Sequence, residues 1–330
     1  MPYTTNTALV FLMLSCAGVP IAQAQTAKPA AAPYPTKQIR VLLPLTAGGP
    51  TDILARLIAQ PLSATLGQPI VIDNRPGASG NIAAEMAAKS PADGYTLFMA
   101  GSGNFAINVG LFRKLPYDPL RDFAPIIVIA SAPFIVATHP SVPVKTLGDL
   151  IKLAKARPGE LNYGAVTGNA AHLATELLKS MANVNIVHIP YKGAAPATTD
   201  LIAGHLHLSL SSTPGSMPFV QTGKLRALAV TSAKRITPLP ELPTVNESGL
   251  KGYEASTWYG IVAPTGTPRQ IIERLYTEID KIIAQPSMRE RMLANHYEPI
   301  SLGPEPFLVY MKSEIDKWAK VIKSSGTKQE

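Results

Sequence analysis

Apolar and polar positions along the chain follow two periods, and the two alternate over most of its length. Short runs rich in β-branched residues predict strands over 39–43, 69–73, 95–100, 126–130, 134–138, 161–166, 186–189, 206–210, 225–231 and 253–262. Apolar residues at helical spacing predict helices over 51–67, 81–89, 146–157, 170–181, 195–203, 268–284, 286–295 and 304–324, with a short helix after Pro214. This alternation predicts an α/β fold with largely parallel sheets, followed by a helical tail.

The predicted elements suggest two α/β lobes. We expect the chain to cross between them near 129–134 and again near 252–258. Lobe 1 would comprise residues 36–130 and 256–330, because the helical tail has too little apolar surface to form its own core. Lobe 2 would comprise residues 131–255. Two crossing strands side by side form a hinge, and ligands favour the cleft between lobes.

The first 24 residues are interpreted as an export signal. The apolar run 8–17 is too short to span a bilayer, and Ala22-Gln23-Ala24 has the small-x-small pattern after which signal peptidases cleave. We predict cleavage after Ala24, a flexible leader over 25–35 and a mature protein in the periplasm. No Lys or Arg precedes the apolar run, so a disordered apolar leader and a lipoprotein attached at Cys16 stay open as alternatives. Cys16 is the single cysteine, so the cleaved chain would depend on its apolar core rather than on disulfides.

Charge and composition narrow the range of partners. The formal net charge of +8 at pH 7 favours anionic ligands and steers them in from solution. The Lys and Arg residues are scattered and form no cluster interleaved with aromatic residues, so we predict no nucleic-acid partner. No stretch after the leader is long and apolar enough to span a membrane.

Three loops that follow successive predicted strands share one chemistry. The loop 44–52 has adjacent Gly48 and Gly49, the loop 74–80 reads Asn-Arg-Pro-Gly-Ala-Ser-Gly, and the loop 101–104 reads Gly-Ser-Gly-Asn. Glycines let the backbone turn tightly, and a helix start offers N–H groups and a positive dipole to a carboxylate or phosphate. The first loop lacks the third glycine of a dinucleotide fingerprint and the lysine of a P-loop, which argues against a nucleotide. The glycines could serve tight turns alone, but three such loops at one sheet edge favour a ligand site.

The second predicted lobe repeats this arrangement, while catalytic and metal-binding patterns are weak. Its polar loops lie over 163–172, 190–196 and 209–214. His205 and His207 would share one face of an extended segment without a third ligand, so we predict no metal ion and no cofactor. His172 is expected either to cap a helix or to line the cleft. The H-E-x-x-H and G-x-S-x-G motifs and a cysteine nucleophile are absent, so we predict no enzyme. The rival is a periplasmic hydrolase or isomerase that uses His172 with Ser102 or Ser211.

Many short segments, in order along the chain, match one known family. They are Tyr34-Pro35 with Ile39-Arg40-Val41, Gly48-Gly49-Pro50-Thr51-Asp52, Asn74-Arg75-Pro76-Gly77-Ala78, Asp93-Gly94-Tyr95-Thr96-Leu97, Leu115-Pro116-Tyr117-Asp118-Pro119, Leu161-Asn162-Tyr163-Gly164, Pro190-Tyr191-Lys192-Gly193, Gly223-Lys224-Leu225-Arg226-Ala227-Leu228-Ala229 and Leu242-Pro243-Thr244-Val245. The sequence resembles the tripartite tricarboxylate transporter receptors, also called Bug solute-binding proteins, across essentially the whole mature chain. The resemblance implies a two-lobed periplasmic-binding-protein fold (type II-like, Venus flytrap) with two inter-lobe crossovers. It also implies delivery of the ligand to membrane transporter subunits or to a sensor kinase, and we expect a monomer.

The same resemblance implies that backbone N–H groups of the first loops hold a ligand carboxylate while the second-lobe loops close over its far end. The mapped residues are Leu45, Thr46, Ala47, Gly48, Gly49, Thr51, Asp52, Gly101, Ser102, Asn104, Thr167, Gly168, Asn169, Ala170, His172, Tyr191, Lys192, Ser211, Ser212 and Thr213. Leu45 stands where the family often has an aromatic residue, and Ser211 stands near a common acid. Without that acid to pair an amine, we expect a dicarboxylate or an aromatic carboxylate rather than an amino acid. A ligand-presenting accessory of a two-component sensor stays the alternative to a transport receptor.

Overall fold

The computed structural model describes residues 1–4, 34–191, 193–237 and 239–327. The chain divides into two units, Met1–Tyr34 and Pro35–Glu330, and the fold below is that of the second unit. The predicted signal segment and leader lie almost entirely outside the described residues, so cleavage after Ala24 stays a prediction. None of the described helices is long and apolar enough to cross a membrane.

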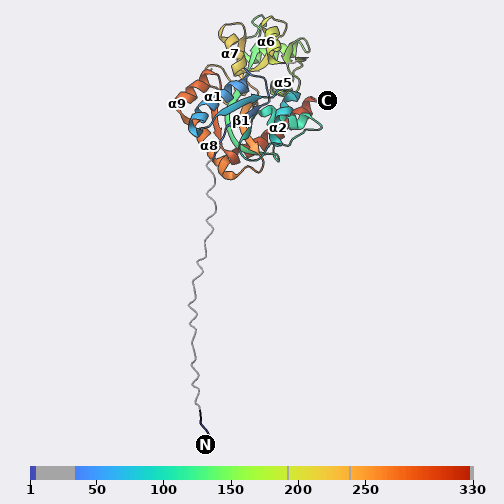
Figure 1. The fold of residues 1–330 in the computed structure, drawn as a ribbon. Coiled ribbons are helices and arrows are strands. Elements are labelled where there is room, and N and C mark those ends of the chain that lie inside the picture. The colour runs from blue at the N-terminus through green and yellow to red at the C-terminus, as the bar shows by residue number, and fades with distance from the viewer. Residues whose placement is uncertain (5–33, 192, 238, 328–330) are drawn as a thin grey trace. The chain divides into compact units, whose positions relative to one another are not determined.

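Strands and helices alternate along the second unit, which confirms the predicted α/β class. The strands are β1 (Ile39–Leu43), β2 (Ile70–Asn74), β3 (Thr96–Gly101), β4 (Phe123–Thr138), β5 (Asn162–Ala165), β6 (Val187–Pro190), β7 (Leu208–Ser212), β8 (Arg226–Val230), β9 (Ser256–Pro264) and β10 (Glu298–Leu302). The α-helices are α1 (Pro50–Leu66), α2 (Asn81–Ala88), α3 (Asn108–Leu111), α4 (Leu147–Ala156), α5 (Ala170–Ala182), α6 (Ala194–Ile202), α7 (Thr213–Gln221), α8 (Arg269–Ala284), α9 (Pro286–Ala294) and α10 (Pro304–Ser325). A 3-10 turn, η1 (Ala78–Gly80), precedes α2, and a π-helical turn, η2 (Gly103–Ile107), precedes α3. Helices α5, α6 and α7 gather at one end of the unit, while α1, α2, α8 and α9 surround β1 at the other (Figure 1).

The strands form one curled sheet with the order β2-β1-β3-β9-β4-β7-β5-β6, and β8 and β10 also pair with β4. Parallel pairs occur in β2-β1-β3 at one end and in β6-β5-β7 at the other. The pairs that involve β4 or β9 are antiparallel. The expectation of largely parallel sheets is therefore wrong in the centre, where neighbouring strands belong to distant parts of the chain.

Strand β4 is a single strand of 16 residues, although the sequence predicts two strands separated by Ser131-Ala132-Pro133. These three residues pair with Trp258, Thr257 and Ser256 at the start of β9, so tertiary pairing overrides the local turn signal. Pro133 lies opposite the first residue of β9, where the ladder between the two strands ends. The first part of β4 pairs with β9 and β10, and its last part pairs with β7 and β8. One strand thus joins the two halves of the sheet.

The prediction of a wholly helical tail is wrong at β10, which pairs antiparallel with β4. Helix α9 ends at Ala294, and His296 adopts a positive φ of 61°, which turns the chain into β10. The strand contains Pro299, which an edge strand tolerates because its outer ladder positions have no partner to lose.

Apolar side chains pack into clusters around both halves of the sheet. One cluster, around β1, β3 and the first part of β4, contains Phe98, Phe105, Phe123, Trp258, Phe307 and Met311. Another, around the last part of β4, contains Phe134, Tyr163, Leu173, Trp318, Val321 and Ile322. Helix α10 contributes side chains to both clusters, Phe307 to the first and Trp318 to the second. The C-terminal helix therefore shares the core of both halves.

Candidate functional site

The loop between β1 and α1 leaves the start of α1 without a side-chain cap. Gly48 adopts a φ of 80°, which favours glycine, and Gly49 is an extended N-cap that makes no side-chain capping bond. Pro50 follows at the first helical position, where its missing N–H costs nothing. The Gly48 N–H donates to Asp52 Oδ2 at 3.0 Å, so this group is engaged inside the loop. The N–H groups of the first turn remain as the positive end of the helix dipole.

Asp52 is 4% exposed and braces this loop. Arg56, one turn further along α1, donates to it twice, Nε to Oδ2 at 2.9 Å and Nη2 to Oδ1 at 3.0 Å. The Arg56 guanidinium holds the pKa of Asp52 below its ordinary value. The carboxylate is therefore charged at neutral pH, and its charge is balanced by Arg56 beside the helix start.

Hydrogen bonds draw the loops after β2 and β3 against the first loop. Asn74 Nδ2 donates to the Leu45 carbonyl at 2.9 Å, and Asn104 Nδ2 donates to the Ser79 carbonyl at 3.1 Å. Gly80 lies between them, since a Cβ there would be 2.6 Å from Pro44 Cβ and 2.6 Å from Asn104 Nδ2. The three loops predicted to share one sheet edge are therefore in contact.

Ser102 and Asn104, both predicted as ligand residues, are buried beneath these loops and hydrogen-bond to neighbouring segments. Ser102 is 0% and Asn104 6% exposed. The Ser102 hydroxyl donates to Thr257 Oγ1 at 3.4 Å, and the Tyr117 hydroxyl donates to the Asn104 carbonyl at 2.7 Å. Asn108 adds bonds to the Ser79 carbonyl and to Asn81. A buried amide network of this kind fixes loop geometry, and the sequence signal for it, three asparagines near glycine loops, is visible only in retrospect.

In the other half of the sheet, the loop after β5 is closed by His172 and Asn169. The Asn169 side chain caps α5 by accepting from the His172 N–H at 2.8 Å. His172 Nδ1 accepts from the Gly168 N–H at 3.1 Å, which requires a ring with Nδ1 unprotonated. Burial lowers the pKa of His172 to about 4, and its ring lies 4.1 Å from that of His188. The histidine therefore supports the loop from behind, and its hydrogen bonds join it to neither Ser102 nor Ser211.

The loops after β6 and β7 are also anchored. Tyr191 donates its backbone N–H to the Ala165 carbonyl at 3.0 Å and its hydroxyl to Asp200 Oδ2 at 2.5 Å. Lys192 lies outside the described residues. The Ser211 hydroxyl is 2.8 Å from that of Ser209, and Ser212 is an N-cap of α7 that makes no side-chain capping bond. Helix α7 therefore starts as α1 does, with an N-cap that leaves its first turn open.

A corner of the chain between α9 and β10 links the starts of these two helices. The Tyr297 hydroxyl donates to the Pro50 carbonyl at the start of α1, at 2.7 Å. The Thr213 hydroxyl, at the start of α7, donates at 3.0 Å to the carbonyl of His296, the residue before Tyr297. Adjacent residues thus hold the first residues of two helices that come from opposite halves of the sheet. The sequence gives no signal for this corner, because it lies in a stretch whose pattern predicts only helices.

The predicted site residues differ in exposure. Those that are exposed are Leu45, Thr46, Ala47 and Gly48. Those that are half-buried are Gly49, Gly101, Thr167, Asn169, Ala170, Tyr191, Ser211 and Ser212. Those that are buried are Thr51, Asp52, Ser102, Asn104, Gly168, His172 and Thr213. Leu45 is 47% exposed, so the first loop also presents an apolar side chain at its surface.

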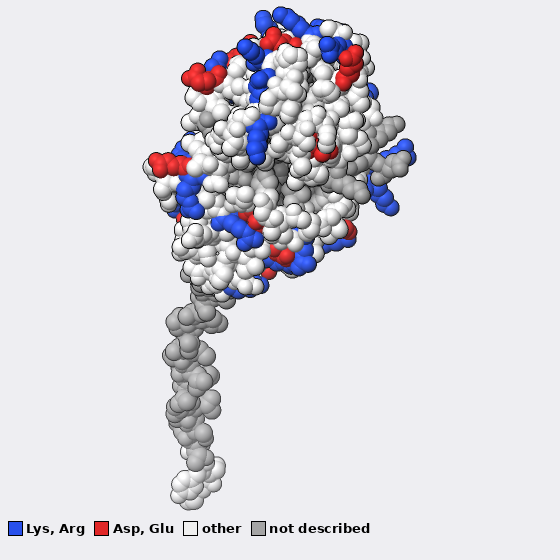
Figure 2. Space-filling view, turned by 90° about the horizontal axis from the view of Figure 1, so that it is seen from above, with Lys and Arg blue, Asp and Glu red and all other residues white. Residues whose placement is uncertain are grey.

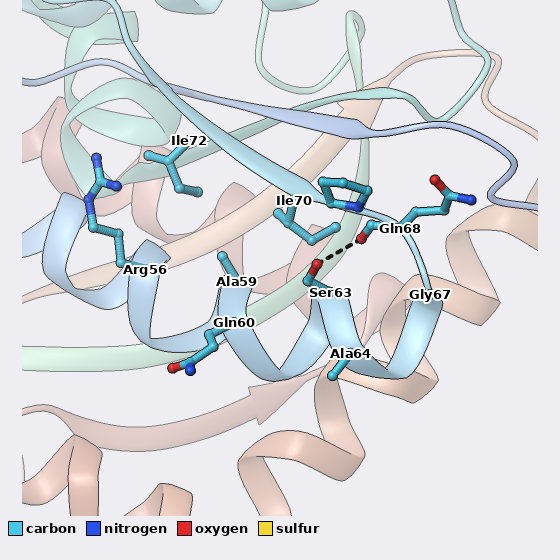
Figure 3. Close-up of a pocket in the computed structure, with 10 residues that line it drawn as sticks. Arg56, Ala59, Gln60, Ser63, Ala64, Gly67, Gln68, Ile70 and Ile72 are labelled. Carbon is cyan, nitrogen blue, oxygen red and sulfur yellow. Dashed lines mark hydrogen bonds between the residues drawn. The ribbon is translucent and has the colours of Figure 1, made fainter.

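A hollow of about 730 Å³ lies elsewhere, between α1 and the edge strand β2 (Figure 3). It is lined by Arg56, Ala59, Gln60, Ser63, Ala64, Gly67, Gln68, Pro69, Ile70 and Ile72. Its walls come from one helix and one strand, and Ser63 is bonded to the Gln68 carbonyl at 2.9 Å. Because no polar groups from different loops converge on it, this hollow lacks the features of a small-molecule site.

In the part of the chain that the structure describes, no group of histidine and acidic side chains could hold a metal ion. Lys, Arg, Asp and Glu residues are interspersed over the face in Figure 2, and most of that face consists of other residues. His205 and His207 take separate partners, Asp200 Oδ1 at 3.4 Å and Asn162 Oδ1 at 2.8 Å.

Comparisons with known proteins agree with the sequence resemblance. A family model described as "Tripartite tricarboxylate transporter family receptor" matches residues 54–327. Protein BugT of Bordetella pertussis is 36% identical over 319 residues, which cover 96% of this chain and 98% of BugT. The solved structure of R. palustris Rpa4515 with adipate has a TM-score of 0.83 and 44% identity, and the match covers 89% of this chain and 99% of that one. MatC (Rpa3494) from Rhodopseudomonas palustris with bound malate has a TM-score of 0.77 and 29% identity, with 88% and 100% covered.

Proposed function

The chain belongs to the tripartite tricarboxylate transporter receptor family, whose members are periplasmic solute-binding receptors, and from that premise we propose that it captures a small dicarboxylate. The resemblance inferred from short sequence segments is confirmed, and the fold is the two-lobed α/β fold of the solved relatives. We also propose the class of ligand, the residues that contact it and the boundaries of the two lobes.

The observation that carries the proposal is the pair of helix starts held by one corner. Helices α1 and α7 both begin without a side-chain cap, and Tyr297 and His296 tie their first residues together. A helix start supplies N–H donors and a positive dipole, which suit a carboxylate. Two such starts, linked through the adjacent residues His296 and Tyr297, suit a molecule with a carboxylate at each end.

Solved relatives support this ligand class. Rpa4515 is solved with adipate and MatC with malate, and both ligands are dicarboxylates. Ser211 and Ser212 add neutral donors at the start of α7, where an acid would be needed to pair an amine. An aromatic carboxylate is the second candidate, because the exposed Leu45 could pack against a ring.

Within the proposed site, contact and support are divided between residues. We assign direct contact to the backbone of Gly49, Thr51, Asp52 and Thr213 and to the hydroxyl of Ser212, with Leu45 beside the ligand chain; the Thr213 hydroxyl is engaged with the His296 carbonyl. Support is assigned to the side chains of Asp52, Ser102, Asn104, His172 and Tyr191, since each is engaged with another part of the protein. The remaining predicted residues lie on the same loops and complete the walls.

The lobe boundaries proposed are 36–130 with 256–330 for lobe 1 and 131–255 for lobe 2. Two observations support them. Strand β4 passes from one half of the sheet to the other, and β9 starts at Ser256 opposite Pro133. Closure of the lobes over the ligand would then pivot on these two neighbouring strands.

The function is tested by isothermal titration calorimetry of the purified protein with a panel of ligands. The panel contains linear dicarboxylates from malonate to suberate, malate, citrate, benzoate and, as monocarboxylate controls, butyrate and hexanoate. We expect saturable binding of at least one dicarboxylate and weaker binding of the monocarboxylate of equal length, which can engage only one helix start. Absence of binding throughout the panel, in calorimetry and in thermal shift, would overturn the carboxylate assignment.

A matched pair of glycine variants places the site on the first loop. Gly48 and Gly223 both have a positive φ, 80° and 71°, and an added Cβ would meet nothing within 4 Å at either position. Gly48→Ala and Gly223→Ala should therefore lose similar stability, about 1–2 kcal/mol each. Only Gly48→Ala should weaken ligand binding; equal affinities in the two variants would move the site away from this loop.

The family also implies a partner that receives the ligand. We propose membrane subunits of a tripartite transporter, with a sensor kinase as the alternative. Pull-down from membranes with ligand-loaded protein distinguishes the two by the identity of the captured component.

A further inference from the structure

We propose that the corner His296-Tyr297-Glu298, between α9 and β10, sets the length of dicarboxylate that the site accepts. This inference rests on the proposed function and adds a specificity-determining segment to it. Neither the sequence pattern nor the resemblance assigns a role to these three residues.

The corner has a well-defined shape. His296 is held at a φ of 61° by hydrogen bonds from its own N–H to the Leu293 carbonyl, 2.8 Å, and from the Tyr297 N–H to the Met292 carbonyl, 3.0 Å. A non-glycine residue adopts this left-handed conformation only where its surroundings fix it. Tyr297 is 0% exposed, and its ring packs edge-on against that of Tyr259 in β9, with centroids 5.8 Å apart.

Three hydrogen bonds radiate from this corner to separate parts of the chain. Tyr297 donates to the Pro50 carbonyl at 2.7 Å, and the His296 carbonyl accepts from the Thr213 hydroxyl at 3.0 Å. Glu298 Oε1 accepts from the Thr237 N–H at 3.1 Å, in the connector that follows β8. One tyrosine side chain and one peptide unit thus span the interval between the start of α1 and the start of α7.

The distance between the two helix starts determines which distance between the two carboxylates of a ligand fits the site. If each helix start binds one carboxylate, each added methylene moves the second carboxylate further from the first. Hydrogen bonds weaken steeply once donor and acceptor leave their preferred distance and angle. A ligand of the wrong length therefore loses bonds at one end while it keeps the apolar contact of its chain.

His296 offers a further polar group at the corner. Its Nδ1 is one of two buried side-chain nitrogen or oxygen atoms without a hydrogen-bond partner in the described part of the chain. Buried polar groups in proteins are nearly always hydrogen-bonded, to protein, water or ligand. A ligand oxygen, or a water that enters with the ligand, would give His296 Nδ1 the hydrogen bond that it lacks.

The competing explanation is that the corner only braces the fold. A brace that is removed lowers stability and weakens all ligands by a similar factor. A spacer that is removed changes the ratio of affinities between short and long ligands, because the two helix starts can then settle at another separation. The ratio therefore separates the two roles.

The test uses two deletions of single hydroxyl groups and a matched control. Tyr297→Phe removes the bond to Pro50, and Thr213→Val removes the bond to His296, each with little change in shape. The control is Tyr253→Phe, because the Tyr253 hydroxyl is also buried and also donates to a backbone carbonyl, that of Ala174, at 2.8 Å. Calorimetry measures Kd for succinate, glutarate, adipate, pimelate and suberate in each protein, and thermal unfolding measures stability.

We expect Tyr297→Phe and Thr213→Val to change the ratio of Kd between the best ligand and its longer neighbours by about fivefold, the equivalent of one hydrogen bond. Tyr253→Phe should lower the melting temperature and leave the ratio unchanged. An unchanged ratio in both corner variants overturns the spacing role while the proposed function stands. If the wild-type protein binds none of the series, the proposed function fails and the spacing role fails with it. The two corner variants are independent, so the loss of one to misfolding leaves the other to decide.

Discussion

Glu314 is a buried carboxylate that holds both tryptophans of the chain, and its replacement tests the contact between α10 and β9. Its side chain is 5% exposed. Its Oε2 accepts from the indole Nε1 of Trp258 at 3.0 Å and from that of Trp318 at 3.1 Å, and Lys317 pairs with its Oε1. Trp258 also stacks on Phe105, directly after Asn104, with centroids 5.6 Å apart. The contact therefore supports the loop after β3, which belongs to the proposed site.

The expected loss of stability follows from the two indole N–H groups that donate to Glu314. Glu314→Leu has an apolar side chain of similar size and leaves two buried indole N–H groups without an acceptor. Each unpaired buried donor costs about 1–3 kcal/mol, and removal of a buried charge offsets part of this cost. We expect Glu314→Leu to lower the free energy of unfolding by about 2–4 kcal/mol. Glu314→Gln keeps one acceptor oxygen and should lose about half as much.

Urea unfolding at pH 7, followed by circular dichroism, measures these differences. Tryptophan emission gives a second readout, because Trp258 and Trp318 are the only 2 tryptophans in the sequence. The control is Glu85→Gln, which breaks the surface pair with Lys89 on α2 and should change stability by less than about 0.5 kcal/mol. If Glu314→Leu stays within about 1 kcal/mol of the wild type, the two indole N–H groups have found other acceptors and Glu314 is not needed to satisfy them.

Two further predictions concern charge. Arg56→Met leaves the Asp52 carboxylate uncompensated beside the proposed carboxylate site at the start of α1 and should weaken dicarboxylate binding about 5- to 30-fold. The double variant Asp52→Asn/Arg56→Met should recover most of the lost affinity. Calorimetry checks both variants, and an unchanged Kd in Arg56→Met would count against a carboxylate site at the start of α1. Stability should fall between pH 6.5 and about 4, because burial lowers the pKa of His172 from 6.5 to about 4 and the unfolded chain then binds a proton that the folded chain does not. This contribution is complete above pH 6.5, is lost as the pH falls towards the folded value, and amounts to at most about 3 kcal/mol. Urea unfolding from pH 4 to 7 should show a flatter slope for His172→Gln, and identical slopes would contradict the assignment.

Local signals were sufficient where the physical cause is local. Helix α1 ends at Leu66 because Gly67 takes the left-handed conformation at its C-cap, and the sequence places that glycine as the stop. Strand β1 is predicted with its observed bounds because its short, mostly apolar run begins after Lys37-Gln38 and ends before Pro44, which cannot donate to a strand ladder. The signal at Ser131-Ala132-Pro133 failed because pairing with β9, more than a hundred residues away in the sequence, keeps the chain extended there. Strand β10 was not predicted for a similar reason, since its partner β4 lies far upstream in the sequence.

The site shows the same division between local and distant causes. That the loops after β1, β2 and β3 meet follows from parallel strands in one sheet, and the sequence pattern predicts it. Which groups are engaged inside the protein does not follow, because it depends on side-chain hydrogen bonds such as those of Asp52 with the Gly48 N–H and of Asn104 with the Ser79 carbonyl. The Tyr297 bond to Pro50 joins residues 247 positions apart, and no periodicity in the sequence reports such a contact.

The proposed site binds carboxylates with helix starts rather than with cationic side chains, and this choice affects its selectivity. The guanidinium of Arg56, in the second turn of α1, is engaged with Asp52, so the pair adds little net charge to the proposed site. Each helix start supplies about half a unit of positive charge, so two of them balance about one of the two charges of a dicarboxylate. The rest of the binding energy has to come from well-aligned N–H and hydroxyl donors, whose strength depends on distance and angle. We therefore expect this receptor to discriminate between dicarboxylates by the spacing of their carboxylates more sharply than by their total charge, and the corner at Tyr297 is the place where that spacing is set.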